Sequence, residues 1–134
     1  MKVVVIDGQG GKMGQMIIER IKNANLACEL TAIGTNSIAT SAMLKAGADA
    51  GATGEHPVVV ACRDADVIVG PIGIIVADSL LGEISPAMAV AIGQSSAKKL
   101  LLPVNLCNNI IVGTGSTSMT KLIAETVDEL AKMT

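Results

Sequence analysis

The sequence predicts a single α/β domain over residues 1–134, built as a doubly wound parallel sheet with helices on both faces. Three observations lead to this prediction. Short runs rich in Val, Ile and Leu alternate with stretches of helical length, which is typical of parallel sheets with crossover helices. The first of these runs ends in a glycine-rich turn that opens a helix. No Pro/Ser-rich linker, charge block or internal repeat divides the chain, and its length suits one domain.

The first strand and helix carry the clearest patterns. Residues 3–6 form a continuous Val/Ile run, which is typical of a parallel strand covered on both faces. From about Gly11 the apolar residues fall on one stripe of a helix and the charged residues lie elsewhere. Strand, glycine turn and helix therefore follow one another directly.

The remaining elements follow from helix caps, from Pro in a first helical turn and from glycine stops. Residues 48–53 give no clear pattern, and residues 58–60 suit either a helix or a strand. The other predicted elements are strands at residues 30–33, 67–69, 100–102 and 110–112, and helices from Asn36 or Ser37 to about Ala46, over residues 57–65, after Ser85 to about Gly93, and over residues 118–132.

Composition narrows the possible partners. Half of the residues are apolar, 16% are charged and the mean hydropathy is +0.56. Few polar side chains remain to cover a monomer, so we expect a homo-oligomer. The chain has no Phe, Tyr or Trp and a net charge of −2, so it offers neither stacking platforms nor a basic surface, and we expect no nucleic acid partner.

Two further features bear on where the protein works. The apolar stretch 67–82 is interrupted by Asp78 and by glycine and proline, so we expect it in a buried core and expect no membrane partner. Cys28, Cys62 and Cys107 form no C-x-x-C pair, and their odd number argues against a disulfide framework. A reducing, cytoplasmic environment fits this cysteine usage best.

The glycine turn is the strongest functional signal, because it has the strand and helix context that the Rossmann fingerprint requires. It consists of Gly8, Gln9, Gly10, Gly11, Lys12, Met13 and Gly14. The strict G-x-G-x-x-G frame fails at Met13, but Gly8, Gly11 and Gly14 satisfy the variant G-x-x-G-x-x-G. Free N–H groups and the positive end of the helix dipole would meet a phosphate there. The alternative is a tight turn that binds nothing.

Thr35 and Asn36 stand where an NAD-binding domain usually has Asp or Glu to accept hydrogen bonds from a ribose. They could bond a ribose, cap the following helix, or do both. No arginine stands nearby for an NADP 2′-phosphate. The turn therefore predicts a phosphate-bearing small ligand more firmly than a dinucleotide, and NAD(P) is one candidate cofactor.

Ligands of open α/β sheets bind beyond the carboxyl ends of the strands. This rule nominates Asp7 and residues 53–55, 70–73 and 105–108. We expect the loop of residues 70–73 either to expose backbone groups to a ligand or to be a structural turn. Its residues are Gly70, Pro71, Ile72 and Gly73. Because Asp7 would repel a phosphate, we expect it to accept N–H groups from a neighbouring loop.

Other candidates for chemistry are few. Asp78 and Glu83 are isolated carboxylates in an apolar neighbourhood, where a raised pKa could suit acid–base work. The alternative is that they cap helices or pair across an interface. Cys107 would need a nearby base to act as a nucleophile, and His56 is the single histidine. No metal-ligand spacing is present.

The turn residues Gly8, Gly11, Lys12, Met13 and Gly14 follow a strand, and this arrangement resembles the N-terminal segment of dihydrodipicolinate reductases. The resemblance covers about a quarter of the chain, and it implies NAD(P)H binding at these residues. It does not extend to the reduction itself, which in that family needs a second domain with histidine and lysine.

A whole-length resemblance rests on five segments, which are Val5-Ile6-Asp7-Gly8-Gln9-Gly10-Gly11, Gly34-Thr35-Asn36 with Ala39-Thr40-Ser41-Ala42, Gly51-Ala52-Thr53-Gly54-Glu55, Gly70-Pro71-Ile72-Gly73 and Gly82-Glu83-Ile84. They resemble a family of short bacterial proteins described only as a domain of unknown function. The resemblance supports a Rossmann-like fold and implies no activity.

Three functions are compatible with these observations. The leading one is a nucleotide-binding, non-catalytic or accessory domain that holds its ligand at residues 8–14. The second is a small enzyme whose site is completed at a subunit interface by Asp78, Glu83 or Cys107. The third is a structural or protein-interaction module with an inert Rossmann shell.

Overall fold

The computed structural model describes residues 1–104 and 108–134, and within them the chain forms one parallel sheet of five strands in the order β3-β2-β1-β4-β5. The strands are β1 (Lys2–Asp7), β2 (Glu29–Gly34), β3 (Ala50–Thr53), β4 (Val67–Pro71) and β5 (Lys98–Leu102). The helices are α1 (Lys12–Asn23), α2 (Ser37–Lys45), α3 (Glu55–Ala61), α4 (Pro86–Gln94) and α5 (Met119–Ala131), with a short 3-10 helix η1 (Ile72–Ile75).

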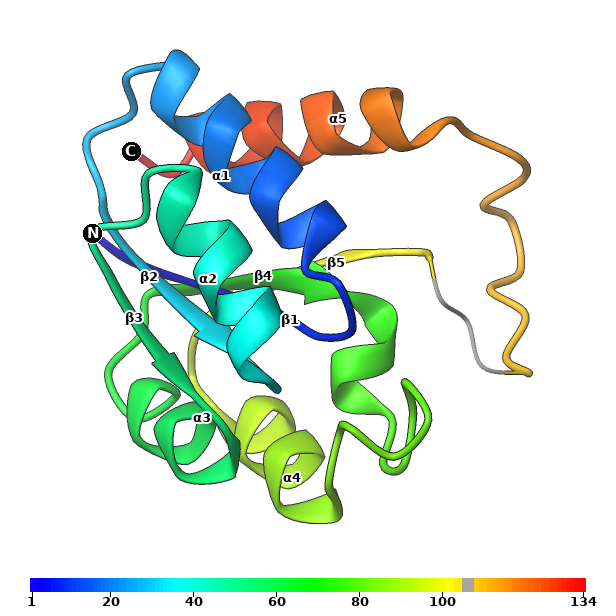
Figure 1. The fold of residues 1–134 in the computed structure, drawn as a ribbon. Helices are drawn as coiled ribbons and strands as arrows, with labels where there is room; N and C mark the ends of the chain where they lie inside the picture. The colour runs from blue at the N-terminus through cyan, green and yellow to red at the C-terminus, as the bar shows by residue number, and fades with distance from the viewer. Residues whose placement is uncertain (105–107) are drawn as a thin grey trace.

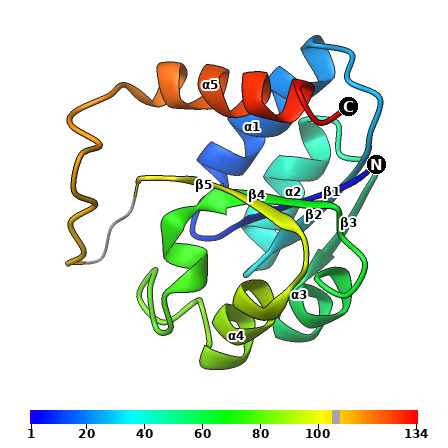
Figure 2. The ribbon, with the colours of Figure 1, turned by 180° about the vertical axis from the view of Figure 1, so that it is seen from behind.

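Helices cover both faces of the sheet, as Figures 1 and 2 show from opposite sides. The helices α1, α2 and α5 lie on one face, and α3 and α4 lie on the other. The predicted doubly wound α/β fold is confirmed. No helix in the described part of the chain combines the length and the apolar character needed to span a bilayer.

The strand order reverses at β1. This strand pairs with β2 on one side and with β4 on the other, and both pairings are parallel. The chain first builds outward from β1 to β3, then crosses over to β4 and continues to β5. The reversal therefore lies between the carboxyl ends of β1 and β4, the place where ligands of open α/β sheets bind.

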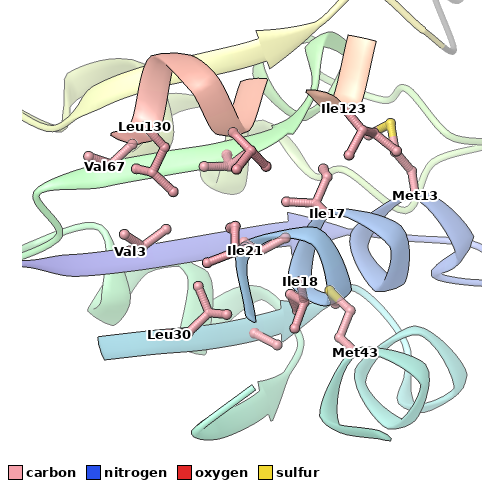
Figure 3. Close-up of a cluster of buried hydrophobic side chains, with 14 of the residues drawn as sticks. Val3, Met13, Ile17, Ile18, Ile21, Leu30, Met43, Val67, Ile123 and Leu130 are labelled. Carbon is pink, nitrogen blue, oxygen red and sulfur yellow. The ribbon is translucent and has the colours of Figure 1, made fainter. Parts of the chain in front are cut away.

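Two apolar cores explain why β1 is a continuous Val/Ile run. Val3 and Val5 belong to the core under α1, α2 and α5, whereas Val4 and Ile6 belong to the core under α3 and α4. All four side chains are at most 4% exposed. Figure 3 shows part of the first core, in which residues of α1 and α5 pack on the sheet.

Helix caps fix several boundaries as predicted. The Asn36 Oδ1 accepts the Ala39 amide at 2.9 Å and starts α2, and the Ser118 Oγ accepts the Lys121 amide at 3.3 Å and starts α5. Ser85 precedes α4, where its Oγ accepts the Met88 amide at 3.2 Å. These local interactions belong to the sequence itself, so the pattern was sufficient to find them.

Two predicted elements need correction. Residues 110–112 are not a strand, because Ile110 and Val112 are 86% and 92% exposed in a connection that runs away from the sheet. A short apolar run becomes a strand only beside a partner strand, and this one has none in the described structure. The predicted helix over residues 57–65 is α3, which begins earlier and ends at Ala61, so residues 58–60 are helical.

Candidate functional site

The glycine turn connects β1 to α1 with little room for side chains. Gly11, the residue before α1, has φ +72°, and a Cβ built on it would lie 2.7 Å from the Ala39 Cα. A Cβ on Gly8 would lie 2.6 Å from the Thr35 Oγ1, and one on Gly14 would lie 2.5 Å from the Met43 Sδ. Backbone contact and a positive φ therefore favour glycine at position 11, and side chains of Thr35 and Met43 crowd positions 8 and 14.

Gly10 differs from these three glycines. It is exposed, and a Cβ built on it would meet no atom within 4 Å. Packing therefore does not explain glycine at this position. Gly10 stands two residues before α1, in the turn where a ligand phosphate is predicted to approach the backbone.

Asp7 ends β1 and is 4% exposed. Its Oδ1 accepts the Gly8 amide and its Oδ2 accepts the Gly14 amide, both at 2.8 Å. Burial raises the pKa of Asp7, and the two amide donors only partly oppose this effect. We expected Asp7 to accept N–H groups from a neighbouring loop. The source of the donors was wrong, because Gly8 and Gly14 belong to the turn and the helix that directly follow Asp7.

Glu83, which the sequence offers as an isolated carboxylate, lies at the glycine turn of its own chain. Its Oε1 accepts the Gln9 amide at 2.9 Å, the Thr35 hydroxyl at 2.6 Å and the Asn36 Nδ2 at 2.7 Å. The connection from η1 to α4 thereby reaches across the end of β1 to the end of β2. A carboxylate thus stands beside the end of β2 after all, although it comes from a distant part of the sequence.

The pKa of Glu83 also differs from the expectation. Burial acts to raise it, but the hydrogen bonds from Thr35, Gln9 and Asn36 outweigh burial and hold the pKa below its ordinary value. The prediction of a raised pKa was based on the apolar sequence neighbours of Glu83, and it was wrong because the three donors come from other segments. Glu83 reaches the turn of its own chain.

The amides of the turn divide into two groups. Those of Gly8 and Gly14 donate to Asp7, that of Gln9 donates to Glu83, and that of Gly11 donates to the Gly8 carbonyl at 2.9 Å. The amides of Gly10, Lys12 and Met13 have no protein partner among the described residues. Part of the predicted anion site is therefore already satisfied by the protein, and part is open.

Thr35 and Asn36 both contact the turn. Asn36 caps α2 and its Nδ2 also donates to the Gln9 carbonyl at 2.9 Å, so capping and a place at the site coexist, as the sequence left open. The Thr35 hydroxyl is taken by Glu83. Neither donor is free for a ribose while Glu83 stays in place.

The segment 70–73 does not expose its backbone. Gly70 and Pro71 are the last residues of β4, and Ile72 and Gly73 open η1. Gly70, Pro71 and Gly73 are buried, and the Gly73 carbonyl accepts the Val76 amide and the Ser79 hydroxyl. A Cβ on Gly70 would overlap the Ile6 carbonyl. Of the two alternatives, the structural one therefore holds, and Gly70 allows the close approach of β4 and β1.

The other candidates lie apart from these contacts. The Glu55 Oε2 accepts the Ser85 hydroxyl at 2.6 Å, and Thr53 shares a hydrogen bond with Thr40. Asp78 and His56 are exposed. Asn105 and Cys107 lie outside the described residues, and no group of three or more His, Cys, Asp or Glu suited to a metal ion is found in the rest.

Comparison with known proteins assigns the family. A family model described as "Domain of unknown function (DUF3842)" matches residues 2–134. The chain belongs to this family. The expected whole-length resemblance is thereby confirmed, and it adds no activity.

Two other comparisons were less informative. A search of curated proteins found no match. Among solved structures, the chain is similar to the crystal structure of a dodecameric FMN-dependent UbiX-like decarboxylase from Escherichia coli O157:H7. The two are 11% identical, the match covers 99% of this chain and 94% of that chain, and the TM-score is 0.44.

Proposed function

We propose that this DUF3842 protein is a nucleotide-binding domain with an accessory role, which holds a phosphate of its ligand at the glycine turn. The observation that carries the proposal is a set of three amides, of Gly10, Lys12 and Met13, just before and at the start of α1, which lack a partner among the residues that the structure describes. Backbone amides at a helix N-terminus are suited to a phosphate. Their place at the reversal of strand order supports the same ligand class.

Two further observations support a phosphate. Gly10 adds no side chain to the turn, and a Cβ built on it would meet no atom within 4 Å. The exposed Lys12 supplies a positive charge beside them. The base of the nucleotide is not specified by any of these contacts, so NAD(P) is one candidate to be compared with others.

The proposal is tested by calorimetric titration with pyrophosphate, NAD(H), NADP(H), ATP and FAD. We expect saturable binding of at least one nucleotide and of pyrophosphate. Absence of both heat and thermal stabilisation across the whole set would contradict the proposal and favour an inert shell.

A matched pair of variants locates the site. Gly10→Ala should keep the fold, because its Cβ meets open space, but it should weaken binding about tenfold by holding the phosphate away from the amides. Gly93→Ala is the control, since Gly93 on α4 also has no atom within 4 Å of a built Cβ. Equal affinities for the two variants would place the ligand elsewhere.

A further inference from the structure

The carboxylate of Glu83 stands where an anion is expected. It collects donors from two strand ends, because Gln9 follows β1 and Thr35 and Asn36 follow β2. The three contacts join residues that are 47 to 74 positions apart in the sequence. Its second oxygen, Oε2, has no partner among the described residues. Donors that converge on one carboxylate oxygen can equally donate to a phosphate oxygen.

The backbone that delivers Glu83 is strained. Asp78, Leu80 and Leu81 have φ of 67°, 55° and 55°, a region that non-glycine residues rarely adopt, and Gly82 follows at 89°. Leu81 is also 97% exposed, so burial does not reward its conformation. Such strain persists only where other contacts enforce it, and here it ends at the residue that reaches the glycine turn.

The residues on either side of Glu83 can stay in place while its side chain moves away from the turn. Leu80 and Ile84 are at most 3% exposed and anchor the connection in the core under α3 and α4. Leu81 and Gly82 are exposed and Glu83 is half-buried. The carboxylate can therefore turn away from Gln9 without unpacking either anchor. Figure 1 shows this connection, in green, at the end of the sheet where β1 leads into α1.

We propose that Glu83 is a built-in competitor of the ligand, and that a phosphate group of the bound nucleotide displaces it from Gln9, Thr35 and Asn36. This inference rests on the proposed function. The phosphate then has six donors, the three released by Glu83 and the amides of Gly10, Lys12 and Met13. Because only the fraction of molecules with Glu83 displaced binds ligand, the observed affinity is lower than that of the open site.

The test is titration of pyrophosphate into wild type, Glu83→Gln and Glu83→Ala at constant pH. Both variants remove the competing charge, and we expect each to bind about tenfold more tightly than wild type. Glu19→Gln is the control, because it removes the same charge from the exposed face of α1 and should bind like wild type.

The outcomes separate the two proposals. If wild type binds pyrophosphate and the Glu83 variants bind equally or more weakly, Glu83 is no competitor, while the ligand site stands. If none of the proteins binds, the proposed function fails and this inference fails with it. If only the Glu83 variants bind, the competition is established directly.

A spectroscopic readout distinguishes displacement from a general change in stability. The Gln9 amide donates to Glu83. Its resonance in a ¹⁵N–¹H spectrum should therefore differ between wild type and Glu83→Ala. Addition of pyrophosphate to wild type should also shift this resonance. Resonances of Lys22 and Asn23, at the opposite end of α1 from the turn, should stay unchanged. A Gln9 resonance that does not respond to saturating pyrophosphate would overturn the displacement.

Discussion

Asp7 and Glu83 enclose the glycine turn between two carboxylates of different character. Asp7 is buried behind the turn and holds the Gly8 and Gly14 amides. Glu83 is half-buried and accepts the Gln9 amide. Burial raises the pKa of the first, whereas three donors lower the pKa of the second. Asp7 holds two amides of the turn in place, and Glu83 links the turn to the residues that follow β2.

The lowered pKa of Glu83 makes stability depend on pH. Since the folded chain binds the Glu83 proton less tightly than the unfolded chain, the contribution of Glu83 is complete above the unfolded pKa and is lost as pH falls through the folded pKa. The pKa of Asp7 is raised, by burial first and also by the charge of Glu83, so the contribution of Asp7 to stability increases as pH falls over part of the same acidic range.

Comparison with Glu83→Gln isolates the effect of Glu83. Urea unfolding between neutral pH and pH ~3 should show that wild type loses more stability than the variant as the pH falls, because Asp7 is present in both. At neutral pH the variant should be the less stable of the two. Parallel curves would mean that the hydrogen bonds to Glu83 do not favour its ionised form.

At the scale of helices and strands, some elements are placed by local sequence signals and others by pairing between distant segments. Caps at Asn36, Ser85 and Ser118 start three helices at the places that the sequence predicts. The edge strand β3 escaped prediction because its residues are exposed or half-buried and carry no apolar alternation. It exists because its backbone pairs with β2.

Ser85→Ala should destabilise the fold by about 1–2 kcal/mol, the usual cost of losing an N-cap. The Ser85 hydroxyl caps α4 and also donates to Glu55 at the start of α3, so the substitution weakens two helix starts. Urea unfolding measures the change. Ser41→Ala on the exposed face of α2 is the control and should change stability by less than about 0.5 kcal/mol. If Ser85→Ala changes the free energy of unfolding no more than Ser41→Ala does, this cap contributes nothing to stability.

At the scale of the whole molecule, the two cores do not bury all of the apolar side chains. Val60 of α3 and Val90 of α4 are 43% and 53% exposed. Val90 also lines a hollow of about 530 Å³ between these helices, together with Val59 and Ala87. An apolar surface of this kind is costly to leave in water. The expected homo-oligomer would cover it.

Sedimentation should therefore reveal species heavier than the 13.6 kDa chain. Val90→Lys should shift them toward the monomer by placing a charge on the α3 and α4 face, without loss of thermal stability in the monomer. Ala24→Lys, at the exposed end of α1, should leave the mass unchanged. A wild-type chain that is monomeric at micromolar concentrations would contradict this prediction.

The sequence by itself determined the fold class, four of the five strands, the main helix starts and the place of the glycine turn. It could do so because apolar periodicity, caps and glycine spacing act between residues close in the chain. Only the tertiary structure decided that Gly70, Pro71 and Gly73 are buried, that residues 110–112 have no strand partner in the described part of the chain, and that Glu83 reaches Gln9. These outcomes depend on which distant segments lie side by side, and that is set by strand order and packing, which local patterns do not encode.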